Sequence, residues 1–150
     1  MSHRIDYAKI SPDGFAAFGA VHATIRKCGL PKDLVDLVYL RVSQINGCAF
    51  CIDMHTRDLL RAGVSAAKLA LLPVWRDAGA VFTAREGDAL AWAETVTRVA
   101  QTGIPDADYA AAAATFSDKE LADLTYAIAL MNAFNRFGVA FRSAPAAARA

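Results

Sequence analysis

Two thiols and one imidazole lie close together in this sequence: Cys48, Cys51 and His55. In a helix that starts near Cys48, at about 100° per residue, Cys51 falls about 60° and His55 about 20° from Cys48. All three side chains then share one narrow stripe. Leu59 continues the stripe, while Asp53 lies on the opposite side. This spacing predicts a joint thiol–imidazole site on the inward face of a helix.

Each of these side chains has a chemical role available to it. A free thiol is only about 3% thiolate at neutral pH, and the thiolate is the nucleophile. The amides of a helix N-terminus stabilise negative charge, which favours Cys48 as the attacking thiol. An imidazole four residues after a thiol can accept its proton, which favours Cys51 with His55 as base. From spacing alone, both assignments stay open.

Asp36 is a further candidate, because it is a carboxylate in an otherwise apolar helical segment. Buried near His55, it could orient the imidazole or hold a water molecule. A competing interpretation comes from a short internal repeat, in which residues 32–39 match residues 119–126 at five of eight positions with a constant offset of 87. The repeat places Asp123 where the first copy has Asp36. A carboxylate that recurs without the thiols can equally serve packing or capping.

Metal binding is the weaker interpretation of the cysteine pair. A zinc site needs three or four ligands. The remaining candidates stand at no familiar spacing, and they are Cys28, His22 and His3. A purely structural pair of small buried residues is the other alternative. We expect redox chemistry without a metal or other cofactor.

Composition places these residues in one domain spanning residues 1–150. Apolar residues make up 55% and charged residues 21% of the chain, and we expect the surplus apolar surface to be buried between identical subunits. The net charge of +1 is scattered, which argues against nucleic-acid binding. No apolar run approaches the ~20 residues that span a membrane, and the first residues lack a secretory h-region. The odd number of cysteines does not suit a secreted disulfide framework, so these features together predict a cytoplasmic protein.

Helix signals recur along the whole chain, and no strand alternation interrupts them. Ser11-Pro12-Asp13 starts one helix, and Gly29 with Pro31 ends it. Two capping boxes open helices over about 84–101 and 118–140. The other expected helices cover about 32–45, 48–63 and 106–115, with a short one after Ser65 that Pro73 interrupts. We predict an all-α bundle of about six to seven helices, with residues 143–150 as a flexible tail.

The thiol pair also lies in a distinctive segment, Leu40-Arg41-Val42-Ser43-Gln44-Ile45-Asn46-Gly47-Cys48-Ala49-Phe50-Cys51, followed by Met54-His55. This segment resembles the signature of the alkylhydroperoxidase AhpD-like proteins of the carboxymuconolactone decarboxylase superfamily. The similarity extends to residues 90–94, 116–121 and 132–136, and so covers nearly the whole chain. It implies an all-α fold, assembly into trimers or hexamers, and reduction of organic hydroperoxides at the expense of a dithiol reductant or redox partner protein.

The resemblance also implies a role for each residue. In the peroxidase branch the second cysteine attacks the peroxide and the first resolves the sulfenic acid, which assigns Cys51 as attacker, Cys48 as resolver and His55 as base. The relay glutamate of the family corresponds to Asp36, and its additional histidine corresponds to Phe50. The decarboxylase branch lacks the cysteine pair. The replacement of the family's glutamate by Asp36 and of its additional histidine by Phe50 motivates an alternative prediction, a disulfide oxidoreductase or redox sensor without peroxidase turnover. A non-enzymatic helical assembly is the third class of function.

Overall fold

The computed structural model describes residues 3–149, and every regular element among them is helical. The α-helices are α1 (Tyr7–Ile10), α2 (Pro12–Ile25), α3 (Lys32–Asn46), α4 (Ala49–Arg61), α5 (Ala66–Leu71), α6 (Ala84–Thr97), α7 (Val99–Thr102), α8 (Asp106–Thr115) and α9 (Asp118–Ala140). Short 3₁₀ helices lie at η1 (Leu72–Asp77), η2 (Gly79–Val81) and η3 (Ala146–Arg149). The predicted all-α fold is confirmed. None of the described helices is long and apolar enough to cross a membrane.

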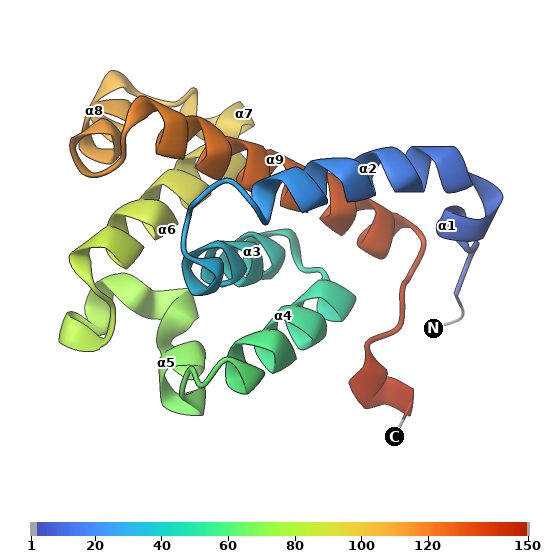
Figure 1. Cartoon of the computed structure of the whole chain (residues 1–150). Coiled ribbons are helices and arrows are strands. Elements are labelled where there is room, and N and C mark those ends of the chain that lie inside the picture. Colours follow the sequence, from blue (N-terminus) through green and yellow to red (C-terminus); the bar gives the residue numbers. More distant parts are fainter. Residues whose placement is uncertain (1–2, 150) are drawn as a thin grey trace.

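Helix α3 occupies the middle of the bundle, between α9 and α4 (Figure 1). It also packs against α6, and nine of its residues from Leu34 to Ser43 are buried. A helix that is apolar nearly all round is stable only when other helices cover it on several sides. This position makes α3 the scaffold for both α4 and α9.

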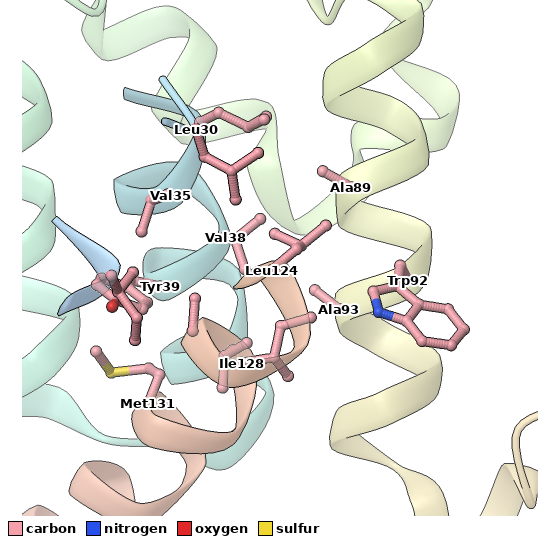
Figure 2. Packing of buried hydrophobic residues seen from close by; sticks show 14 of the residues in the cluster. Leu30, Val35, Val38, Tyr39, Ala89, Trp92, Ala93, Leu124, Ile128 and Met131 are labelled. Atoms are coloured by element: carbon pink, nitrogen blue, oxygen red, sulfur yellow. The ribbon is translucent and has the colours of Figure 1, made fainter. Parts of the chain in front are cut away.

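The main core forms where α3, α6 and α9 meet. Figure 2 shows Val35 and Val38 of α3 facing Leu124 and Ile128 of α9, with Ala93 of α6 alongside. Small alanines on α6 let the three helices approach closely. A second cluster, around Leu37, Leu59 and Leu90, joins the opposite side of α3 to α4 and α6. The two clusters fix the position of α4 relative to α9.

Both predicted capping boxes are present. The Thr83 hydroxyl accepts from the Glu86 amide while the Glu86 carboxylate accepts from the Thr83 amide, and Ser117 and Glu120 repeat this exchange. Each pair satisfies two backbone donors that a helix start leaves free. Ser65 caps α5 as predicted, and Pro73 stands at the start of the 3₁₀ turn that follows α5.

The number of helices differs from the expected six to seven, because nine α-helices form among residues 3–149. Two of them are single turns, α1 and α7. The segment predicted as one helix over 84–101 divides at Arg98, whose φ of −99° and ψ of 31° are not helical. At the other end of the chain, residues 146–149 form a turn beside α4, where the Ala146 amide donates to Asp53 Oδ2 at 2.8 Å.

Candidate functional site

A left-handed glycine makes the turn that places Cys48 at the start of α4. Gly47 has φ 68° and ψ 32°, a conformation that costs glycine little and other residues more. The Cys48 amide then donates to the Ser43 carbonyl at 3.0 Å, which closes the end of α3. Asn46 ties the same turn to α9, because its Nδ2 donates to Asn132 Oδ1 at 2.9 Å and to Asn135 Oδ1 at 3.0 Å.

Cys48 and Cys51 are joined by a disulfide at the first turn of α4, with their Cα atoms 5.3 Å apart. Cys48 is the N-cap residue, and its Sγ accepts from the Cys51 amide at 3.4 Å. The relative exposures of Cys48 and Cys51 are 1% and 3%. Both sulfurs are therefore enclosed by the fold, and Gly138 of α9 lies directly against them.

The stripe predicted from the sequence faces inward. His55 and Leu59 are the other buried residues of α4. On the outer side, Asp53 and Arg57 form an ion pair with each other. Helical spacing correctly predicted that the cysteines and the imidazole lie on the buried face of α4.

His55 is a buried imidazole, and neither ring nitrogen has a hydrogen-bond partner among the described residues. No hydrogen bond joins it to either sulfur of the disulfide. The Tyr39 ring of α3 lies beside it, with the two centroids 5.2 Å apart. Burial lowers the pKa of His55 to about 4, although the charges of Asp36 and Asp58 oppose this shift. At neutral pH the ring is therefore uncharged, and burial makes it a weaker base than an exposed imidazole.

Asp36 is buried on α3, and its charge is balanced by two cations rather than by a histidine. Lys32 binds one carboxylate oxygen, and Arg26 Nη1 lies 3.4 Å from the other. Asp36 makes no hydrogen bond to His55. In the second copy of the repeat, Lys119 and Asp123 make the same pairing of residues four apart, at 2.5 Å. Helices α3 and α9 pack together, but α9 runs unbroken where the first copy turns at Gly47.

Glu94 of α6 is a buried carboxylate that was not among the candidate site residues. Arg41 Nε donates to its Oε1 at 2.8 Å, Trp75 Nε1 donates to the same oxygen at 3.0 Å, and Arg76 binds Oε2. Burial raises the pKa of Glu94, but the hydrogen bonds from Arg76, Trp75 and Arg41 outweigh it and hold the pKa below its usual value. A lone acid directly after the apolar run 89–93 was the available signal.

Tyr39 is the second residue that was not singled out, and it is fully buried with its hydroxyl unpaired among residues 3–149. Cys28 is a half-buried free thiol that packs on the main core. In the part of the chain that the structure describes, no three histidine, cysteine or acidic side chains gather closely enough to hold a metal ion.

The sequence and the fold of this chain are both similar to those of known proteins. Residues 12–95 match the carboxymuconolactone decarboxylase family. The chain is 30% identical to the uncharacterized protein YdfG of Bacillus subtilis (strain 168), over 93% of this chain and 95% of that protein. It is 51% identical to the alkyl hydroperoxide reductase AhpD of Rhodopseudomonas palustris (strain BisA53) over 41 residues, which are 27% of this chain and only 23% of the reductase.

A solved structure is similar over almost the full length. It is a protein of unknown function from Agrobacterium tumefaciens, proposed to be the antioxidant defence protein AhpD, with a TM-score of 0.92 and 41% identity over 96% of this chain and 98% of that one. The family match, the full-length relatives and the thiol pair at the start of α4 all indicate the same family. The chain therefore belongs to the carboxymuconolactone decarboxylase family, as an AhpD-like protein.

Proposed function

We propose that the protein is a thiol-dependent peroxidase that reduces organic hydroperoxides. One observation carries the proposal: a disulfide-forming pair is buried at a helix start, with an uncharged imidazole one turn further along the same face. The enclosure of both sulfurs favours a small-molecule oxidant over exchange with an exposed protein disulfide.

The proposed chemistry uses Cys51 as attacker, Cys48 as resolver and His55 as base. His55 takes the proton of the Cys51 thiol, and the thiolate sulfur attacks the terminal oxygen of R–O–O–H. The O–O bond breaks, its electron pair leaves with the RO oxygen, and the proton held on His55 completes ROH. Cys51 is then a sulfenic acid. The Cys48 thiol displaces its oxygen as water and forms the disulfide, which a dithiol reductant or redox partner protein reduces.

Asp36 has an electrostatic role in this proposal. Its negative charge raises the proton affinity of His55, against the lowering effect of burial. The contribution is limited, because Lys32 and Arg26 neutralise the same carboxylate. We further propose an antioxidant role in the cytoplasm and assembly as a homotrimer or homohexamer, in keeping with the apolar composition of the chain.

The second candidate is a disulfide oxidoreductase or redox sensor without peroxidase turnover. Phe50 between the two cysteines supports it, because the phenyl ring cannot transfer a proton at that position. A defined reduction potential together with no consumption of hydroperoxide under any dithiol would favour this candidate.

The test follows thiol oxidation by an organic hydroperoxide in stopped flow, with mass mapping of the product. Wild type should form the Cys48–Cys51 disulfide. Cys48→Ser should stop at a Cys51 sulfenic acid, Cys51→Ser should lose the fast reaction, and Cys28→Ser is the control that should behave as wild type. Hydroperoxide consumption by Cys51→Ser at the wild-type rate would overturn the proposal.

A further inference from the structure

Unpaired buried polar atoms are concentrated on two neighbouring rings, Tyr39 of α3 and His55 of α4. Among the described residues, four side-chain nitrogen or oxygen atoms are buried without a hydrogen-bond partner: Tyr39 Oη, both ring nitrogens of His55, and Thr95 Oγ1. Three of the four therefore belong to two adjacent rings. Buried polar groups are normally paired, and a cluster of unpaired ones calls for an explanation such as a bound molecule.

Tyr39 is held rigidly in this position. It is 0% exposed, and its backbone carbonyl accepts from the Ser43 hydroxyl at 2.7 Å. Asn135 Nδ2 of α9 donates to the same hydroxyl at 3.0 Å, and this hydrogen bond fixes the position of α3 relative to α9. Figure 2 shows Tyr39 at the edge of the main core, on the side away from Trp92. The ring is part of the scaffold, yet its hydroxyl contributes no bond to it.

The two rings complement a small molecule that is both donor and acceptor. A phenol can donate and accept, and a neutral imidazole presents one donor and one acceptor nitrogen. The ring planes of Tyr39 and His55 are tilted by 46°, and no direct hydrogen bond joins them. A hydroperoxyl group, R–O–O–H, carries one donor hydrogen and two acceptor oxygens, and so matches what both rings lack.

We propose that Tyr39 is a further catalytic residue, whose hydroxyl binds the hydroperoxyl group together with His55 and donates a hydrogen bond to the leaving oxygen. This inference rests on the proposed function. As the Cys51 sulfur bonds to the terminal oxygen, the electron pair of the O–O bond moves onto the RO oxygen. The phenol O–H stabilises this oxygen by a hydrogen bond until the oxygen takes the proton held on His55. Tyr39 keeps its own proton, and burial, followed by the charge of Asp36, raises its pKa and favours that state.

The experiment compares two reagents on the Cys51 thiol. A Cys28→Ser, Cys48→Ser background leaves Cys51 as the single thiol of the chain. Iodoacetamide alkylates the thiolate and releases iodide, which needs neither a hydrogen-bond donor nor a proton. Hydroperoxide needs both. Tyr39→Phe removes only the hydroxyl, and the exposed Tyr126→Phe is the matched control.

We expect Tyr39→Phe to slow oxidation by the hydroperoxide about 100-fold, the usual effect of losing one donor to a developing oxyanion, with alkylation unchanged. Its melting temperature should not fall, because the hydroxyl has no protein partner to lose. Equal losses with both reagents, or no loss with either, would overturn the inference. A wild-type protein that does not react with hydroperoxide would instead remove the proposed function itself.

A second measurement does not depend on the variant. A high-resolution crystal structure of the reduced protein should show an ordered oxygen, from water or peroxide, within hydrogen-bond distance of both Tyr39 Oη and a His55 nitrogen. A Tyr39 hydroxyl that donates to a protein carbonyl there would contradict the inference. The kinetic comparison separates a site for peroxide from a site that holds only water.

Discussion

Gly138 of α9 lies against the sulfur of Cys48, so that a Cβ atom at this position would stand 2.7 Å from Cys48 Sγ and 3.5 Å from Cys51 Sγ. No side chain fits at such a separation. A free thiol could rotate away, but a sulfur held in a buried disulfide cannot. The glycine is therefore required by the oxidised form of the pair more than by the reduced form.

We expect Gly138→Ala to destabilise the oxidised protein by about 1–3 kcal/mol, the usual cost of overpacking a core. The reduced protein should lose less, because its thiols can change rotamer. Urea unfolding of both forms measures the difference. Gly19→Ala on α2 is the control, since a Cβ there meets nothing within 4 Å and should raise helix stability. Equal losses in the two redox forms of Gly138→Ala would contradict this explanation.

The buried imidazole predicts a loss of stability in mild acid. The pKa of His55 is about 4 in the folded protein and about 6.5 in an unfolded chain, so only the unfolded state takes up the proton between these values. The stability at neutral pH is retained above pH 6.5 and declines as the pH falls towards 4, by about 3 kcal/mol for this group. Unfolding across that range should show a steeper decline in wild type than in His55→Gln, because carboxylates of lowered pKa such as Glu94 titrate in both proteins. A midpoint near pH 6.5 in an NMR titration of the His55 ring would refute the lowered pKa and this prediction with it.

Removing the carboxylate charge of Glu94 should have a large effect on the stability of the protein. Glu94→Gln leaves Arg41, whose side chain is only 12% exposed, without its counter-charge, and removing one partner of such a pair should cost about 2–4 kcal/mol. Asp58→Asn is the comparison, because Arg61 in its ion pair is 73% exposed and such pairs contribute under about 1 kcal/mol. Denaturant unfolding of both variants tests the contrast. A similar small loss in both would show that solvent reaches Arg41.

Asp36 and Asp123 allow the catalytic and structural interpretations of the repeat to be separated. Each makes an ion pair with a lysine four residues earlier, but only Asp36 acts electrostatically on His55. Asp36→Asn should lower the pKa of His55 further and slow Cys51 oxidation, while Asp123→Asn should leave both unchanged. The stability loss should be about 1 kcal/mol for Asp123→Asn, because Lys119 in that pair is 72% exposed. Asp36→Asn should cost more, because Asp36 is buried and Arg26 also loses its counter-charge. Equal rates in the two variants would restrict Asp36 to packing.

Local signals in the sequence were sufficient for most of the fold. The capping boxes at Thr83 and Ser117 act through hydrogen bonds within a few residues, and each began a helix where predicted. The inward stripe of α4 followed from helical spacing alone. The break at Arg98 was missed because arginine is a good helix former and gives no local sign of the turn.

Long-range contacts account for the rest. Arg41 meets Glu94 across 53 positions, and Asn135 meets Ser43 across 92, so no spacing in the sequence brings either pair together. Asp36 was correctly placed on a buried face, but its cations on α3 and after α2 were not foreseen. Tyr39 was overlooked because a tyrosine in an apolar helix is most often simply core.

The enclosure of the two sulfurs has a kinetic consequence for renewal of the thiols. A dithiol must approach a sulfur in line with the S–S bond, and in the oxidised fold α9 covers that bond at Gly138. Local opening of helix packing would have to precede each exchange. The rate of re-reduction should then level off as the dithiol concentration rises, with a ceiling equal to the rate at which the helices part.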